Sequence, residues 1–315
     1  MLLSILAGMF LPGAAAVTAG FLAAAYPPFI FYSNMKLTEC LFGFLFLLTC
    51  CLLTRTFRDR DNGSFIWAGI VHGISVLVRA PTLLFPAVMA PLILFTGLRK
   101  SLLKGFLLYA AIGAAIISAW SIRNYLALGD TLAVNTGSGT LLWYAVQDDA
   151  WNGDEIAVIY PTREYPELAN LSRAKMESIV ARRVVKRAIT HPLWYSGKLA
   201  RNFWRLWTLP IGKVMLARVS PRLAGLYQAA HYLLLAIALC GLLYISRNNF
   251  LAALPSLLYL FYVSLMHSVI LGTPRYRLPY DYLMLMFAAG GLVFLYRALL
   301  EKKSAPSNGA DPASI

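Results

Sequence analysis

The chain has 315 residues, of which 59% are hydrophobic and only 13% charged, and its mean hydropathy is +0.64. This composition excludes an ordinary soluble domain, in which the apolar fraction is clearly lower. The net charge of +14 would suit a nucleic-acid-binding protein, but the basic residues lie in loops beside apolar segments and no aromatic RNA-binding motif accompanies them. Nucleic acid is therefore excluded as a partner, and anionic membrane lipid is favoured.

Apolar runs recur along the chain at close to the length of a membrane-spanning helix, which is about 20 residues for a hydrocarbon layer of roughly 30 Å. They predict an all-α, multi-pass membrane protein with about eight spans. The predicted spans cover residues 13–32, 38–54, 65–78, 82–96, 105–121, 226–245, 251–271 and 281–298. The third and fourth are short and flank Pro81, so they form either two crossings or a re-entrant hairpin.

The basic residues of the short connections predict the orientation of these spans. They fall on one side when the spans alternate, and the positive-inside rule makes that side cytoplasmic. These residues are Arg55, Arg58, Arg60, Arg99, Lys100, Lys104, Arg247, Arg297, Lys302 and Lys303. The opposite side receives residues 32–39, 79–82, 122–225 and 271–280, so the unusual polar residues face outward.

Four regions follow from this pattern. Residues 1–121 form an N-terminal membrane bundle, 122–225 an outer loop domain of mixed, mainly helical structure, 226–300 the C-terminal spans, and 301–315 a disordered cytoplasmic tail. Within the outer domain an amphipathic helix is predicted over 172–190, with Met176, Val180, Val184 and Ala188 on one face. The aromatic and basic residues from Trp194 to Trp207 are typical of a segment at the level of the lipid headgroups.

Cysteine and histidine usage predicts no metal site and no disulfide framework. All four cysteines, Cys40, Cys50, Cys51 and Cys240, lie inside apolar runs and are interpreted as small core residues. The four histidines are His72, His191, His231 and His267, and none has metal-ligand spacing with another histidine or a cysteine. Structural roles are favoured for all of them. No cofactor is predicted, and a divalent cation is left open.

The first candidate site lies at the mouth of the second span, where Lys36 and Glu39 are three residues apart. A carboxylate there can act as a general base, bind a metal ion or form a salt bridge with Lys36. The alternative is a carboxylate favoured by the helix dipole at a helix start that Thr38 caps.

Two further candidates are arginines beside apolar segments. Burying Arg79 in lipid would cost roughly 2.5 kcal/mol or more, so such a residue usually faces a cavity or ligand, although it can also snorkel to the surface. Arg123 and Asn124 follow the fifth span, where they can hold a phosphate or a sugar or act as an ordinary interfacial anchor.

The segment from Gly272 to Asp281, between two strongly apolar spans, carries the strongest functional signal. Its arginines, Arg275 and Arg277, flank Tyr276, and prolines stiffen the connection. Two guanidinium groups can hold a phosphate or pyrophosphate. Positive charge on the outer side also runs against the orientation bias, so we predict that this segment binds an anionic ligand.

The order of these motifs extends over nearly the whole chain. The motifs are Ala24-Ala25-Tyr26-Pro27-Pro28 with Tyr32-Ser33 and Thr38-Glu39, then Arg79-Ala80-Pro81, Trp120-Ser121-Ile122-Arg123-Asn124-Tyr125, His191-Pro192 and Arg275-Tyr276-Arg277-Leu278-Pro279. The order resembles that of the GT-C fold glycosyltransferases. It is most similar to the bacterial relatives of protein O-mannosyltransferases and of the lipid A aminoarabinose transferase, glycosyltransferase family 39.

The resemblance implies a GT-C-like helical bundle in the bacterial inner membrane with its large loop in the periplasm or outside the cell. It implies an inverting hexosyl- or pentosyltransferase that moves a sugar from a polyprenyl-phosphate carrier to a lipid, glycan or protein acceptor. The substrate-binding residues would be Arg275, Tyr276, Arg277, Arg79 and Arg123, to which the reading of the residues adds Lys36.

The catalytic acidic residue of the family, often an Asp-Glu pair, lies in the first outer loop, and this chain is expected to begin beyond that point. The general base would then be absent unless Glu39, Asp148 or Asp149 replaces it, and Glu39 is the candidate retained.

Two other functions remain open. One is a transporter or flippase of a phospholipid-linked sugar, which also needs arginines facing a cavity. The other is a non-catalytic remnant of the family, acting as a membrane scaffold. The large outer domain on one side favours the transferase, because transporters usually show repeated halves and broken helices near the midplane.

Overall fold

The computed structural model describes residues 1–35, 37–95, 99–129, 137–147, 151–152, 155–156 and 160–304. Apart from an antiparallel ribbon of β1 (Trp151–Asn152) and β2 (Glu155–Ile156), the regular structure in this part of the chain is helical. The first half contains α1 (Leu2–Gly8), α2 (Gly13–Ala25), α3 (Pro27–Ser33), α4 (Glu39–Asp59), α5 (Gly63–Val78), η1 (Ala80–Thr82), α6 (Phe85–Phe95) and α7 (Arg99–Leu128). The expected all-α architecture is therefore confirmed.

The outer segment and the C-terminal helices complete the fold. The outer segment contains α8 (Ser138–Val146), α9 (Pro161–Glu164), η2 (Pro166–Asn170), α10 (Arg173–Thr190), α11 (Pro192–Thr208) and α12 (Lys213–Val219). It is followed by α13 (Pro221–Asn248), α14 (Phe250–Ile270), α15 (Pro274–Arg277), η3 (Leu278–Tyr280) and α16 (Asp281–Ser304). α7 continues to Leu128, past the predicted boundary at 122, and α13 begins at Pro221, before the predicted 225. Residues 301–304 of the predicted disordered tail belong to α16, and residues 305–315 lie outside the described residues.

Five helical segments of the described chain are long and apolar enough to cross a membrane. They are Glu39–Asp59, Leu102–Ala127, Pro221–Ile245, Phe250–Ile270 and Pro274–Glu301. A sixth is possible if α2 and α3, bent by 54° at Tyr26, count as one span. The remaining two predicted spans correspond to the shorter apolar helices Gly63–Val78 and Ala80–Phe95, so the length criterion supports a multi-pass protein but not the full count of eight.

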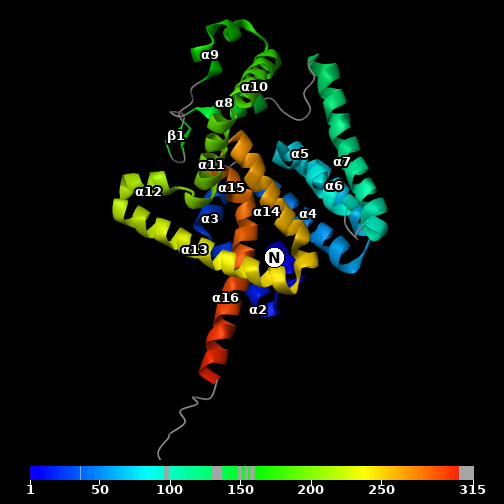
Figure 1. Cartoon of the computed structure of the whole chain (residues 1–315), viewed down its shortest axis with the longest axis vertical. Helices are drawn as coiled ribbons and strands as arrows, with labels where there is room; N and C mark the ends of the chain where they lie inside the picture. The colour runs from blue at the N-terminus through cyan, green and yellow to red at the C-terminus, as the bar shows by residue number, and fades with distance from the viewer. Residues whose placement is uncertain are drawn as a thin grey trace, which may run out of the picture.

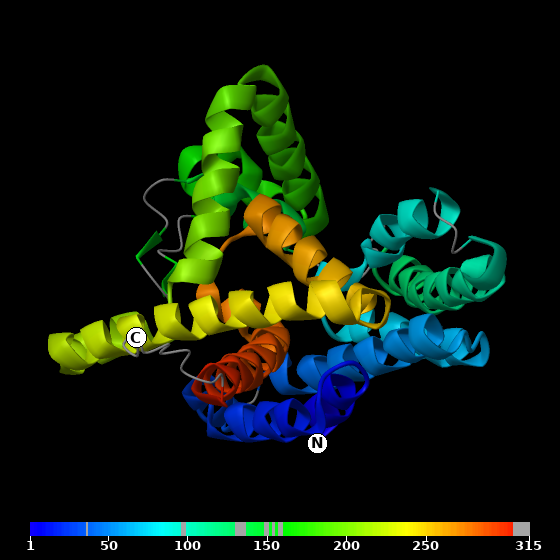
Figure 2. The same ribbon diagram turned by 60° about the horizontal axis from the view of Figure 1, so that its bottom comes forward.

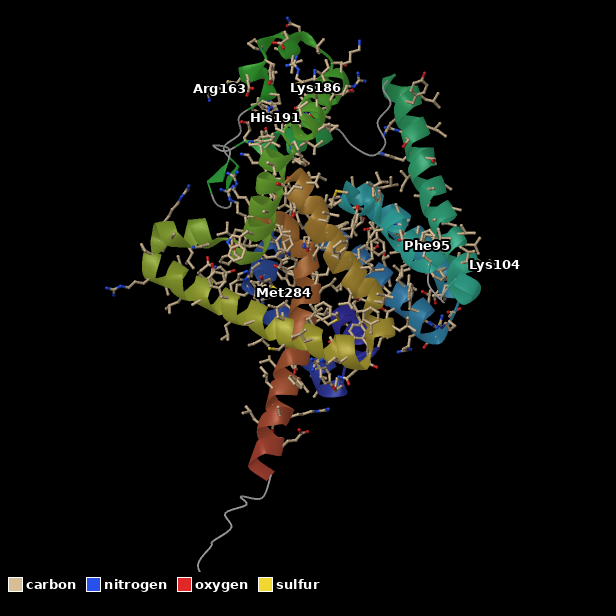
Figure 3. All side chains as sticks on the ribbon, in the orientation of Figure 1. Phe95, Lys104, Arg163, Lys186, His191 and Met284 are labelled. Atoms are coloured by element: carbon tan, nitrogen blue, oxygen red, sulfur yellow. The ribbon has the colours of Figure 1, made fainter. Side chains whose placement is uncertain are left out.

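The helices form a bundle from which a separate lobe projects. In Figures 1 and 2, α8, α10 and α11 extend together from one end of the bundle, while α5, α6 and α7 lie along one side of it. Figure 3 places Arg163, Lys186 and His191 in this lobe, Met284 in the bundle and Lys104 near the start of α7, away from the lobe. We call α8 to α11 with their connections the outer lobe.

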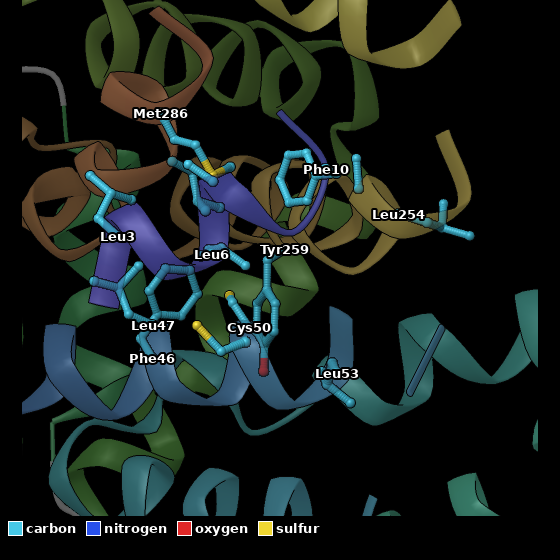
Figure 4. Close-up of a cluster of buried hydrophobic side chains, with 14 of the residues drawn as sticks. Leu3, Leu6, Phe10, Phe46, Leu47, Cys50, Leu53, Leu254, Tyr259 and Met286 are labelled. Atoms are coloured by element: carbon cyan, nitrogen blue, oxygen red, sulfur yellow. The ribbon is translucent and has the colours of Figure 1, made fainter. Parts of the chain in front are cut away.

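The main core contains the short helix α1, which the sequence pattern did not predict. Leu3, Leu6 and Phe10 from this N-terminal segment are buried and contact side chains of α4 and of the C-terminal helices. Figure 4 shows them packed around Phe46, Cys50 and neighbouring residues. Cys50 and Cys51 are buried, as expected of core residues, whereas Cys240 is half-buried and Cys40 is exposed, so the interpretation of all four cysteines as core residues is wrong for Cys40.

The helices α13 and α16 approach each other closely at two glycines. A Cβ atom on Gly241 would overlap the carbonyl oxygen of Phe287, and one on Gly291 would overlap that of Ile237. Small residues at such contacts let two membrane helices pack backbone against backbone.

Replacing Gly241 by alanine is therefore expected to lower the free energy of unfolding by about 1–3 kcal/mol, because the backbones must separate. Unfolding in mixed detergent micelles measures this change. Gly225 in the same helix is the matched control: a Cβ there meets no atom within 4 Å, so Gly225→Ala should be neutral or stabilising by up to about 1 kcal/mol. Equal destabilisation by both variants would contradict the close helix contact.

The outer lobe has a small core of its own. Val180 and Val184 of α10 are buried against Trp143, Val146 and Leu168. Met176 packs beside them, so three of the four residues predicted on the apolar face of this helix contact this core. The Glu177 carboxylate accepts hydrogen bonds from the backbone N–H (2.7 Å) and hydroxyl (2.6 Å) of Thr140, at the start of α8. An anion there stabilises the helix N-terminus.

Candidate functional site

Three charged residues from distant parts of the sequence meet at the N-terminal end of α4. Arg79 Nη1 lies 2.9 Å from Glu39 Oε1, and Arg275 places Nε at 3.1 Å and Nη2 at 3.0 Å from the same oxygen. The side chain of Glu39 is 2% exposed, that of Arg79 15% and that of Arg275 43%. We call these three residues the charged cluster.

Local structure explains how each member reaches this place. Glu39 is the first residue of α4, and Arg79 caps the C-terminal end of α5 in an extended conformation. Arg275 lies on α15, a short turn with Pro274 at its first position, where a proline is well tolerated. The connection before α15 lies directly against α11, because a Cβ on Gly272 would overlap the backbone of Asn202.

Tyr276 supports the charged cluster from one side. The Arg79 guanidinium lies 5.6 Å from the centre of the Tyr276 ring, a cation–π contact. The His267 ring stacks on the same tyrosine at 5.7 Å, with an angle of 7° between the rings. Arg79 Nη1 also lies 3.4 Å from the hydroxyl of Thr38. Arg79 is therefore held from several directions, whereas Arg275 remains open to solvent on part of its surface.

The cluster has one net positive charge, because two guanidinium groups share one carboxylate. Two arginines held at a fixed separation can form charge-assisted hydrogen bonds with a phosphate or carboxylate. Glu39 already accepts some of the hydrogen bonds that the two guanidinium groups can donate, and it keeps both arginines in position before a ligand binds. The arrangement is suited to binding an anionic group at this end of the bundle.

Arg277 lies in different surroundings, since its side chain is 1% exposed and that of its partner Asp281 is fully buried. Arg277 Nε donates to Asp281 Oδ1 at 2.7 Å, and the Tyr26 hydroxyl donates to Asp281 Oδ2 at 3.0 Å. Arg277 Nη1 also donates to the carbonyl oxygens of Leu206, Trp207 and Leu209 at the end of α11.

These contacts hold the C-terminal end of α11 against the bundle. The last carbonyls of a helix lack partners within the helix, and a cation near them is favourable. Two side chains of α13 also contact carbonyls at the end of α11. Gln228 Nε2 donates to the Thr208 carbonyl at 2.7 Å, and His231 Nε2 lies 2.8 Å from the Trp207 carbonyl. Arg277 thus joins the outer lobe to the membrane helices.

The pairing of Arg275 and Arg277 on one phosphate, expected from the sequence, does not fit this geometry. The expectation treated residues 272–281 as a loop, in which alternate side chains can face one ligand. Residues 274–277 instead form the helical turn α15, and residues two apart on a helix face different sides. Arg275 accordingly joins Glu39, while Arg277 is enclosed beside Asp281.

The other predicted residues are not brought to the charged cluster. Arg123 lies near the end of α7, is exposed, and contacts Asn124 (3.1 Å to Oδ1) and the Trp120 ring (5.2 Å). These contacts fit the alternative interpretation of this motif, an ordinary interfacial anchor. Lys36, Asp148 and Asp149 lie outside the described residues.

Sequence reasoning assigned no functional role to His267, Asp281 or Tyr26. Both ring nitrogens of His267 are buried without a hydrogen-bond partner in the described part of the chain. A signal was available for Asp281, because an acid four residues after an arginine at the start of an apolar helix predicts an ion pair on one helix face. No comparable signal existed for His267 or Tyr26, whose partners are far away in the sequence.

Neither a metal-binding group nor a known relative identifies the function of this site. Among the described residues, no group of three or more His, Cys, Asp and Glu side chains could hold a metal ion. No protein-family model, curated protein or solved structure matches this chain.

Proposed function

We propose that the protein is a membrane glycosyltransferase that moves a sugar from a polyprenyl-phosphate carrier to an acceptor at the outer face of the membrane. The observation that carries the proposal is the charged cluster, in which Arg275 and Glu39, 236 residues apart in the sequence, meet Arg79 at the outer end of the bundle. All three residues belong to motifs that resemble family 39, and the three motifs that contain them meet at the charged cluster.

The reaction requires an anion site of this kind. As the bond between the anomeric carbon and the phosphate oxygen breaks, the electron pair remains on the phosphate, and positioned cations stabilise the charge that develops. The acceptor forms the new bond to the anomeric carbon and loses a proton to a base. We assign phosphate binding to Arg275 and Arg79, and to Glu39 the task of holding both guanidinium groups in place.

One feature favours the flippase as the second candidate. The bend of 54° between α2 and α3 is a broken apolar segment, and broken helices are typical of transporters. The substrate of such a flippase would be the same phospholipid-linked sugar, so the charged cluster suits both candidates.

A transfer assay tests the proposal. The purified protein is incubated with polyprenyl-phosphate-linked hexoses or pentoses and a membrane extract as the source of acceptors. Sugar is expected to move from the lipid carrier, and nucleotide sugars are expected to be inactive as donors. Movement of the intact carrier across liposomes without sugar transfer would favour the flippase, and transfer from nucleotide sugars alone would contradict both candidates.

A further inference from the structure

A cavity of about 500 Å³ lies beside Glu39, within the size range of binding sites for small molecules. Its walls come from α1, α2, α3, α4, η3 and the start of α16. The lining residues are Met1, Leu2, Leu3, Gly20, Ala23, Ala24, Phe29, Tyr32, Ser33, Glu39, Cys40, Phe44, Leu47, Leu278, Pro279 and Tyr282. Arg79 and Arg275 are not among them.

The cavity is polar at one end and apolar at the other. Tyr32 and Ser33 end α3, and Glu39 and Cys40 begin α4 after a short connection, so these four residues lie at the outer end. Leu47 lies eight residues after Glu39 along α4, which places it about 12 Å deeper at a rise of 1.5 Å per residue. An amphiphile with a polar end group and an apolar chain matches this distribution.

Glu39 decides which polar end group is suitable. It is the one residue with a charged side chain among the described residues that line the cavity. Both arginines contact Oε1, whereas Oε2 is buried without a hydrogen-bond partner in the described chain. Buried polar atoms of native proteins nearly always have a partner, which can be water or a ligand. A carboxylate oxygen accepts hydrogen bonds, so the ligand atom beside Oε2 must be a hydrogen-bond donor, which an ionised phosphate oxygen is not.

We infer that the cavity binds a lipid whose chain lies along α4 and whose hydroxyl or amino group donates a hydrogen bond to Glu39 Oε2. The site adjoins the one assigned to the carrier phosphate, and Glu39 belongs to both. Its ligand is the acceptor, which would then be a lipid and not a glycan or protein; this last step rests on the proposed function.

Cys40 provides a direct probe of occupancy. It is an exposed free thiol on the cavity wall, whereas Cys50 and Cys51 are buried. With Cys240 replaced by alanine, the rate at which a small methanethiosulfonate reagent modifies Cys40 reports whether the cavity is filled. A ligand at ten times its dissociation constant leaves about one site in eleven free, so modification should slow about tenfold.

The probes are 1-hexadecanol, hexadecylamine and hexadecyl phosphate, which share one chain and differ in the end group. The alcohol or the amine is expected to protect Cys40, and comparing these two identifies the donor group. The phosphate should protect poorly. Equal protection by the phosphate, or no protection by any of the three, would overturn the inference. If none of them protects Cys40, the donor to Oε2 is water.

A pair of variants locates the protection. Ala24 lines the cavity, whereas the neighbouring, equally exposed Ala25 does not. Ala24→Phe should fill the cavity and abolish the effect of the alcohol or amine, and Ala25→Phe should leave it intact. Loss of protection in both variants would contradict binding in this cavity. The measurement needs no sugar and no turnover, so protection without transfer activity would leave the lipid site standing and remove only the glycosyltransferase proposal.

Discussion

Replacing Asp281 by alanine is expected to lower the free energy of unfolding by about 3–5 kcal/mol, the usual cost of leaving a buried charge without its partner. Arg277 and Asp281 are essentially inaccessible to solvent, and the hydroxyl of Tyr26 would lose its acceptor as well. Unfolding in mixed detergent micelles measures the change. The matched control is Glu167→Ala, which removes the 60%-exposed partner of Arg183 and should cost less than about 1 kcal/mol.

The double variant Arg277→Met with Asp281→Leu separates the ion pair from the anchoring of α11. Removing both charges avoids an unpaired buried charge, so the double variant should be more stable than Asp281→Ala alone. It should remain less stable than the unaltered protein, because the carbonyls at the end of α11 lose a donor. A double variant no more stable than Asp281→Ala would contradict this account of the pair.

Replacing Arg275 by alanine is expected to lower kcat/KM for transfer from a polyprenyl-phosphate sugar by about 10²–10³-fold. This is the usual effect of removing one group that stabilises developing negative charge. Arg275→Lys should recover part of the loss, because lysine restores the charge without the planar fork of donors. Steady-state transfer rates over a range of donor concentrations measure both effects.

Arg123→Ala is the matched control for this prediction. Arg123 is also an arginine beside an apolar helix, but it contacts Asn124 and Trp120 near the end of α7. Its replacement should leave the transfer rate nearly unchanged. Equal losses in Arg123→Ala and Arg275→Ala would contradict the assignment of phosphate binding to the charged cluster.

Much of the fold could be predicted because apolar runs dictate helices in a membrane, where backbone groups must be satisfied within the segment. Each predicted span coincides with a helix or with a pair such as α2 and α3. The short helix α1 was missed, because seven residues fall below the length that a span requires. The boundary at residue 121 was early, since α7 continues to Leu128 past the apolar part.

The members of the charged cluster could be predicted one by one, but their pairing could not. Glu39, Arg79 and Arg275 stand out because a charge beside an apolar span needs a reason. A single sequence holds no distances, so nothing indicated that Glu39 would pair with two arginines. The burial of Arg277 beside Asp281 was not predicted, because this segment was expected to be a connection, whereas Pro274 begins a helical turn there.

Arg275 and Arg277 lie on the same four-residue turn, α15, so a displacement of one arginine also displaces the other. Arg277 binds the carbonyls at the end of α11, and Arg275, two residues earlier, binds Glu39. A slide of α11 by one residue rise, about 1.5 Å, would either break the contacts of Arg277 or drag the turn with it. In the second case Arg275 would leave its position at 3.0 Å from Glu39. A displacement of α11 would therefore also change the contact between Arg275 and Glu39, because α15 carries both arginines.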